Sequence, residues 1–112
     1  LSNLKIKDIN IKTGNIKMLE IKHQDTGSKG EFYVGEEGHH LAEMTYSWAG
    51  TDKFIIDHTW VDDSLRGQKV GRQLVDRAVE LARQKNVKIL PLCPFAKSVF
   101  DKDSSIRDVL FS

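Results

Sequence analysis

The stretch from Arg66 to Arg72 holds the residue types best suited to chemistry in this 112-residue chain. It reads Arg-Gly-Gln-Lys-Val-Gly-Arg and lies between an apolar segment and a long amphipathic one. A glycine-flanked loop at this place gathers backbone N–H groups at the start of the following helix, where the helix dipole is positive. The pattern predicts a site for a phosphate-bearing ligand, and we expect these residues to contact it: Arg66, Gly67, Gln68, Lys69, Val70, Gly71 and Arg72.

A strand must precede this loop and a helix must follow it. Phe54–Val61 is the candidate strand, and Gln68–Lys85 repeats apolar residues at helical spacing. Asn86 suits a left-handed helix cap, and Val87–Leu92 is a second apolar strand. Strand, helix and strand at this spacing predict a right-handed crossover, so we expect the two strands to lie parallel.

The residue pattern in the first half of the chain predicts strands that are joined by tight turns. Glycine-containing turns separate three candidates, which are Leu19–Lys22, Glu31–Val34 and His40–Trp48. Beyond the crossover we expect two short helices, Phe95–Asp101 and Ser104–Phe111, the latter with Ser104 as N-cap. The predicted fold class is therefore α+β with a mixed sheet, in which an antiparallel meander is followed by a βαβ unit.

The length of the chain predicts one domain, over residues 18–112. Residues 1–17 alternate apolar and polar side chains, so they could be either an edge strand or an extension outside the domain.

The composition argues against several partners. The formal net charge is +1 with basic and acidic residues interspersed, which indicates neither a nucleic-acid tail nor a membrane-surface patch. No apolar stretch approaches the ~18 residues that would cross a bilayer. The single cysteine, Cys93, cannot form an internal disulfide, which favours a reduced, cytoplasmic location.

Three motifs in order resemble the GNAT-type N-acetyltransferase superfamily, in particular a minimal single-domain branch of it. They are His58-Thr59, Leu65-Arg66-Gly67-Gln68 and Pro91-Leu92-Cys93-Pro94-Phe95. The superfamily's acetyl-CoA signature, Arg/Gln-x-x-Gly-x-Gly/Ala, corresponds here to residues 66–71. The resemblance covers about residues 31–111 and implies a GNAT-like fold in which the two parallel strands splay apart.

The resemblance also implies a cofactor and a reaction. The cofactor would be acetyl-CoA, with Trp60 and Val61 at the strand end that contacts the pantetheine arm. The reaction would be transfer of the acetyl group to a primary amine of a small molecule or a protein lysine. Two positions depart from the superfamily pattern. Lys69 replaces the first glycine, so it must have a negative φ or tolerate strain of ~1–2 kcal/mol. The segment around Ser98 lacks the tyrosine that usually protonates the thiolate.

Acetyl transfer requires a neutral amine, a donor for the oxyanion and a proton for the CoA thiolate. The backbone N–H of Val61 is the candidate oxyanion donor. We consider Cys93 as nucleophile, acid or packing residue, and His58 as base or structural histidine. Strand alternation predicts Asp57 and Thr59 on one face, with His58 and Trp60 on the other. His39 and His40 lie in a turn without further ligands at suitable spacing, so no metal site is predicted.

Two other functions fit the same residues. The chain could be a CoA- or acyl-CoA-binding module with little or no catalysis, which the missing tyrosine and Lys69 favour. It could also be an interaction domain that binds some other phosphate, although the three motifs argue against this. The small size of the domain predicts a shallow acceptor side, suited to a protein amine or to completion by a second subunit in a homodimer.

Overall fold

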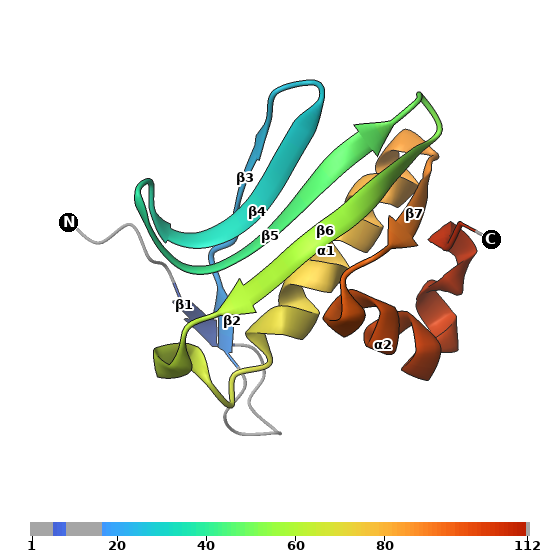
Figure 1. The fold of residues 1–112 in the computed structure, drawn as a ribbon. Helices are drawn as coiled ribbons and strands as arrows, with labels where there is room; N and C mark the ends of the chain where they lie inside the picture. Colours follow the sequence, from blue (N-terminus) through green and yellow to red (C-terminus); the bar gives the residue numbers. More distant parts are fainter. Residues whose placement is uncertain (1–5, 9–16, 112) are drawn as a thin grey trace.

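Five strands form one mixed sheet in a computed structural model that describes residues 6–8 and 17–111 (Figure 1). Their bounds are β3 Lys22–Asp25, β4 Lys29–Glu36, β5 His39–Ala49, β6 Lys53–Val61 and β7 Lys88–Pro91. The sheet order follows the chain, with antiparallel pairing from β3 to β6 and parallel pairing between β6 and β7. The predicted α+β class, an antiparallel meander followed by a βαβ unit, is confirmed.

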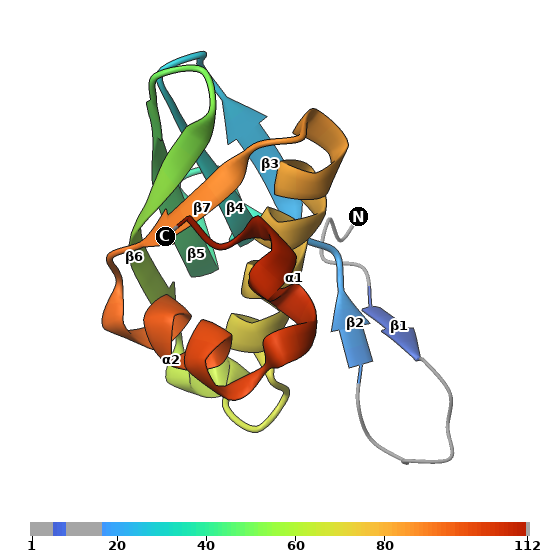
Figure 2. The same cartoon turned by 90° about the vertical axis from the view of Figure 1, so that its right-hand side faces the viewer.

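The long helix α1, Val70–Lys85, connects the two parallel strands and packs against one face of the sheet (Figures 1 and 2). Its apolar stripe and the facing strand residues form one buried cluster, in which Leu74, Ala78, Phe32 and Ile56 are almost wholly inaccessible to solvent. Burial of a Leu or Phe side chain stabilises the folded state by about 1.5–3 kcal/mol. This packing fixes the start of α1 relative to β6.

Shorter elements complete the chain. The helix α2, Pro94–Lys102, follows β7 directly, and the 3-10 helix η3, Ser104–Val109, leads back to the sheet. A further 3-10 turn, η2, covers Asp63–Leu65 between β6 and α1. The strands β1, Ile6–Asp8, and β2, Lys17–Leu19, pair with each other in a two-stranded sheet apart from the main one (Figure 2).

Several predicted boundaries were wrong. The strand expected over Leu19–Lys22 does not exist as one unit, because β2 ends at Leu19 and β3 begins at Lys22. The last helix is 3-10, and its N-cap is Asp103 rather than Ser104, since the Asp103 carboxylate accepts from the N–H of Ser105. Most of the opening segment, residues 1–5 and 9–16, lies outside the described residues, so the choice between an edge strand and an extension over residues 1–17 stays open.

The parallel pairing between β6 and β7 stops well before β6 ends. Its last paired residues are Ile56 and Pro91, and the N–H groups of Leu92 and Cys93 then both donate to the carbonyl of Ile56, at 3.2 and 3.1 Å. The second half of β6 therefore has a β5 neighbour on one side and no β7 neighbour on the other. The two strands diverge at this point, which opens a gap in the sheet.

A β-bulge in β6 changes which side chains face the core. Thr45 pairs with His58 and Tyr46 with Ile56, so Asp57 is an extra residue. Beyond the bulge Thr59 pairs with the buried Met44. Asp57 is exposed on the other face, where its carboxylate accepts a hydrogen bond from the Ser47 hydroxyl at 2.7 Å. The prediction that Asp57 and Thr59 share a face was wrong, because simple alternation does not hold across a bulge.

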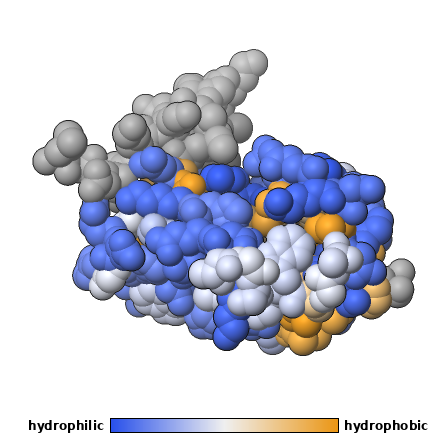
Figure 3. All heavy atoms as spheres, turned by 90° about the horizontal axis from the view of Figure 1, so that it is seen from above, coloured by the Kyte–Doolittle hydropathy of each residue, from blue (hydrophilic) through white to orange (hydrophobic). Residues whose placement is uncertain are grey.

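The end of the molecule at which the β3–β4 and β5–β6 hairpins turn is covered largely by hydrophilic residues, with small apolar areas between them (Figure 3). Within the described part of the chain, no helix is both long enough and apolar enough to cross a membrane.

Candidate functional site

The loop between η2 and α1 presents a row of open backbone N–H groups. In the tight turn before the loop, the backbone N–H groups are already hydrogen-bonded within the turn. Those of Leu65, Arg66 and Gln68 donate to the carbonyls of Asp62, Asp63 and Leu65. In the rest of the loop and the first turn of α1, the N–H groups of Gly67, Lys69, Val70, Gly71 and Arg72 have no acceptor among the described residues. The loop is therefore a concentrated set of donors at the positive end of a helix dipole.

Lys69 creates this arrangement at a conformational cost. It is the residue before α1, and its φ of 57° and ψ of 36° lie in the left-handed region. Of the two alternatives for Lys69, a negative φ or tolerated strain, the structure shows the second, at a cost of about 1–2 kcal/mol for a residue with a Cβ. The helix consequently begins at Val70 rather than at Gln68. No side chain caps it and no acid lies in its first turn.

A pocket of about 570 Å³ lies against this loop. Of the nine residues that the sequence associated with a cofactor, all except Gln68 line it, together with Thr59, Leu65 and Phe95. The pocket thus joins the open amides to the second half of β6, beside the gap in the sheet. This is a continuous surface on which one ligand could contact both.

Gly71 allows the wall of the pocket to come close. A Cβ at this position would lie 2.7 Å from the ring of Phe95, the first residues of α2 being packed against the first turn of α1. Any side chain at residue 71 would therefore displace Phe95 or enter the pocket. Phe95 is itself 41% exposed, so its ring forms an apolar wall open to a ligand.

Three cationic side chains line the pocket, and they differ in whether a carboxylate already pairs with them. Arg66 pairs with Asp63 at 2.6 Å, and both side chains are largely exposed. Arg72 is bound by Asp76 and Asp103, which ties α1 to the segment after α2. Lys69 makes no ion pair within the described residues. Lys69 is therefore the cation that can reach a bound anion without breaking an existing contact.

Cys93 lies where the parallel strands diverge. It is 5% exposed, it precedes the first residue of α2, and its thiol donates to the hydroxyl of Thr59 at 3.4 Å. Burial alone would raise the pKa of this thiol, but its hydrogen bond with the Thr59 side chain and those with nearby backbone N–H groups together outweigh burial and lower the pKa. Cys93 is thus in contact with a pocket residue, although it does not itself line the pocket.

The N–H of Val61 points toward the same gap. The next residue, Asp62, donates its N–H to Leu41 in β5 at 2.8 Å. Because successive N–H groups of a strand point to opposite edges, that of Val61 is directed away from β5, toward the side that β7 leaves open.

His58 lies on the opposite face of β6 from the Thr59–Cys93 contact. Its side chain is 54% exposed, and its Nε2 is 3.7 Å from an oxygen of Glu43. The two candidate catalytic residues are therefore separated by the sheet, and the structure brings only Cys93 into contact with Thr59.

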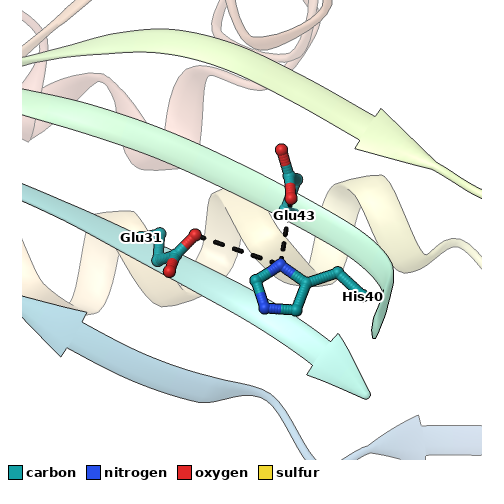
Figure 4. A group of neighbouring side chains, drawn as sticks. All are labelled: Glu31, His40 and Glu43. Carbon is teal, nitrogen blue, oxygen red and sulfur yellow. Dashed lines mark hydrogen bonds and ion pairs between the residues drawn. The ribbon is translucent and has the colours of Figure 1, made fainter. Parts of the chain in front are cut away.

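Near His58 lies a group of side chains that the sequence analysis missed. Glu31, His40 and Glu43 come together on the outer face of the sheet, with possible metal-ligating atoms all within 4.8 Å of one another (Figure 4). They come from the consecutive strands β4 and β5, and they meet only because of how these strands pair, which sequence spacing does not reveal.

Comparison with known proteins points to one family. Residues 30–109 match the model of the GCN5-related N-acetyl-transferase family, which uses acetyl-CoA. The solution structure of a GCN5-like protein from Staphylococcus aureus is 41% identical, with a TM-score of 0.68 over 83% of this chain and 88% of that one. Ribosomal-protein-alanine N-acetyltransferase from Brucella melitensis biovar Abortus 2308 shares the fold, at 14% identity and a TM-score of 0.56 over 68% of this chain and 61% of that one.

One curated relative is much longer. Over 75 residues, or 66% of this chain, the sequence is 32% identical to the short isoform of ulvan lyase from Alteromonas sp. (strain LOR). The chain spans only 14% of the length of that protein.

Proposed function

The chain belongs to the GCN5-related N-acetyltransferase family, and from this premise we propose that it transfers the acetyl group of acetyl-CoA to a primary amine. The observation that carries the proposal is the row of unpaired amides at the start of α1, which opens onto the same pocket as the unpaired half of β6. A diphosphate bound by the loop would leave a pantetheine arm to extend along β6.

The proposed cofactor contacts divide into two groups. Amides of Gly67 and of residues 69–72 hold the diphosphate, and Lys69 supplies a free positive charge beside it. Trp60 and Val61 contact the arm, and Gln68, which does not line the pocket, serves the turn that shapes the loop. Arg66 and Arg72 would contribute charge while keeping their carboxylate partners.

In the proposed reaction the amine nitrogen attacks the thioester carbonyl carbon. The carbonyl oxygen becomes negatively charged and accepts a hydrogen bond from the backbone N–H of Val61. The tetrahedral intermediate then collapses, the carbon–sulfur bond breaks, and the CoA thiolate takes a proton. The amine loses a proton to solvent in the same sequence, since His58 lies on the other face of β6, and an amide and a thiol are the products.

For Cys93 the geometry supports an acid better than a nucleophile. Its thiol is buried behind Thr59, so it would have to move to attack a carbonyl in the pocket, whereas a proton can pass through the Thr59 hydroxyl that it contacts. A thiol whose pKa is lowered also gives up its proton more readily than an ordinary one.

The proposal is tested in two stages. Calorimetric titration with CoA, desulfo-CoA and ADP should show that CoA and desulfo-CoA bind, because the contacts involve the diphosphate and the arm rather than the sulfur. Release of free thiol from acetyl-CoA, measured with a panel of primary amines, then tests turnover. Binding of CoA without amine-dependent thiol release would replace the enzyme by the second candidate, a CoA-binding module, which the lack of a tyrosine in α2 favours.

The role of Cys93 has its own test. Cys93→Ser should reduce turnover while CoA still binds, since a serine hydroxyl is a much weaker acid than a thiol. Mass spectrometry of the wild-type protein after incubation with acetyl-CoA alone should find no acetyl group on Cys93. If Cys93 is acetylated and an added amine then removes the acetyl group, Cys93 is a nucleophile rather than an acid. If the serine variant turns over as fast as the wild type, Cys93 has only a packing role.

A further inference from the structure

The outer face of the sheet carries a second group of side chains that acetyl transfer does not use. His40 Nδ1 lies 3.0 Å from Glu43 Oε1 and 4.0 Å from Glu31 Oε1, and all three side chains point toward one another (Figure 4). His58 approaches the other oxygen of Glu43 at 3.7 Å. Two imidazoles and two carboxylates thus converge from three adjacent strands.

A second β-bulge is responsible for this convergence. Val34 pairs with Ala42 and Gly35 with His40, so Leu41 is an extra residue in β5. Residues 40 and 43 would face opposite sides of a regular strand, whereas the bulge places His40 on the face of Glu43. Gly35 has a φ of 110°, and a Cβ there would lie 2.7 Å from the carbonyl oxygen of His39. The bulge therefore depends on a glycine at that position.

The ring of His40 is held in place by its neighbours. It stacks on Tyr33 with the ring centroids 4.1 Å apart and the planes at 16°, and the Tyr33 hydroxyl accepts from Gln24 at 2.9 Å. The side chain of His40 is 16% exposed and that of Glu43 is 28% exposed. Nδ1 of His40 is thus directed at the two carboxylates rather than into solvent.

The charges of this group are incompletely balanced by the protein. Glu31 and Glu43 lie on the same face, and within the described residues neither pairs with a lysine or arginine, since their ion-pair partners are histidines. When these histidines are neutral, two carboxylates face each other around imidazole nitrogens. Such a set of ligands attracts a divalent cation, and imidazole with carboxylate suits zinc and its neighbours in the transition series.

We propose that Glu31, His40 and Glu43 bind a divalent transition-metal cation of the zinc class on the outer face of the sheet. Zinc ligands at about 2.0–2.2 Å from the metal stand about 3.4 Å apart in a tetrahedral site. The separations of 3.0 and 4.0 Å around His40 bracket this value, and the three ligating atoms all lie within 4.8 Å of one another, so binding would require Glu31 to move toward the other two.

A hollow of about 420 Å³ lies beside this group and is lined by Gly38, His40, Glu43, His58 and Trp60. His58 borders the hollow but is not one of the three residues whose ligating atoms lie within 4.8 Å of one another, so water would complete the coordination. This second site is distinct from the pocket at the α1 loop, although Trp60 borders both.

The test uses tag-free protein stripped with a chelator and then titrated calorimetrically with zinc chloride. We expect one zinc per chain for the wild type and at least about tenfold weaker binding for Glu43→Gln and for His40→Ala. His39→Ala is the matched control, because it removes an exposed histidine one residue away that is not a ligand, and it should bind as the wild type does.

Two measurements make the result decisive. Cobalt(II) should give visible absorption bands with the wild type and with His39→Ala but not with Glu43→Gln. Thermal melts of all variants without metal show whether each is folded, and Glu31→Gln replaces His40→Ala if the latter is not. The proposal is overturned if wild-type protein binds no zinc, or if Glu43→Gln binds it as well as the wild type.

Discussion

The two ends of α1 use the same backbone conformation for opposite purposes. Lys69 before the helix and Asn86 after it both have a φ of 57°. The N–H of Asn86 donates to the carbonyls of Ala82 and Arg83, so the C-terminal end is closed by its own chain. At the N-terminal end the left-handed residue closes nothing and leaves its neighbours' N–H groups open.

This difference distinguishes a structural helix end from one available for a ligand. At the C-terminal end, Arg83 and Lys85 lie in the last turn and complement the negative end of the dipole. At the N-terminal end no acidic side chain lies near the positive end of the dipole, and Lys69 adopts a left-handed conformation that is sterically unfavourable for a residue with a Cβ. A helix end that is left without internal partners, at a cost in stability, is suited to an external anion.

The largest expected effect comes from placing a negative charge at the open end. Gly71→Glu should weaken CoA binding by at least about 100-fold, equivalent to about 2.7 kcal/mol, because the side chain must displace Phe95 or fill the pocket and its charge repels the diphosphate. Calorimetric titration with CoA measures this. Gln84→Glu adds the same charge at the exposed, closed end of the helix and should leave CoA affinity unchanged. Equal losses in both variants would contradict the proposed site.

A smaller effect is expected from relieving the conformation of Lys69. Lys69→Gly and Lys69→Ala both remove the charge, but only glycine adopts a positive φ without a steric cost. The free energy of unfolding in urea should therefore be about 1 kcal/mol higher for Lys69→Gly than for Lys69→Ala. If the two variants are equally stable, Lys69 does not hold the left-handed conformation in solution.

At the start of α2 the expected effect is a shift in titration. Thiolate absorbance of Cys93 against pH should give a midpoint below the ordinary value for a free thiol, because its hydrogen bonds with Thr59 and with backbone N–H groups together outweigh the effect of burial on its pKa. Thr59→Val removes the hydroxyl contact and should move the midpoint upward. A midpoint that does not change in Thr59→Val would show that this contact has no influence on the thiol.

The smallest effect concerns the link from α1 to the segment after α2. Hydrogen bonds from Ser105 and from Arg72 lower the pKa of Asp103 to about 2. Its folded-state pKa is below its unfolded value, so its stabilising contribution is present above about pH 4 and is lost as the pH falls toward 2. Denaturant midpoints between pH 5 and 2 should fall less steeply for Asp103→Asn than for the wild type. Parallel curves would show that the Arg72–Asp103 pair is not formed in solution.

The features that the sequence predicted correctly are those that short stretches of residues determine. The apolar stripe of α1, the left-handed cap at Asn86 and the glycine-flanked loop are all encoded within a few residues, and all three were found in place. Parallel pairing of β6 with β7 follows from chain connectivity alone.

The features that were missed depend on how β5 pairs with the strands on either side of it. The bulges at Asp57 and Leu41 are set by pairing with β5 and β4, and no local pattern of apolar residues marks either of them. For the same reason Glu31, His40 and Glu43 were not associated, since regular alternation would put residues 40 and 43 on opposite faces and only the bulge brings them together.

The extra residue at position 57 has a consequence for how this sequence can vary. Deleting Asp57 would remove the bulge but leave every pair between β5 and β6 in place, because Ile56 and His58 already pair with the neighbouring residues Tyr46 and Thr45. Thr59 would keep its face, and the strand would lose only the local bend of the bulge and the contact of Asp57 with Ser47. Loss of Thr59 instead would send Trp60 toward the core and Val61 outward, so in this strand the position of a one-residue deletion matters more than its size.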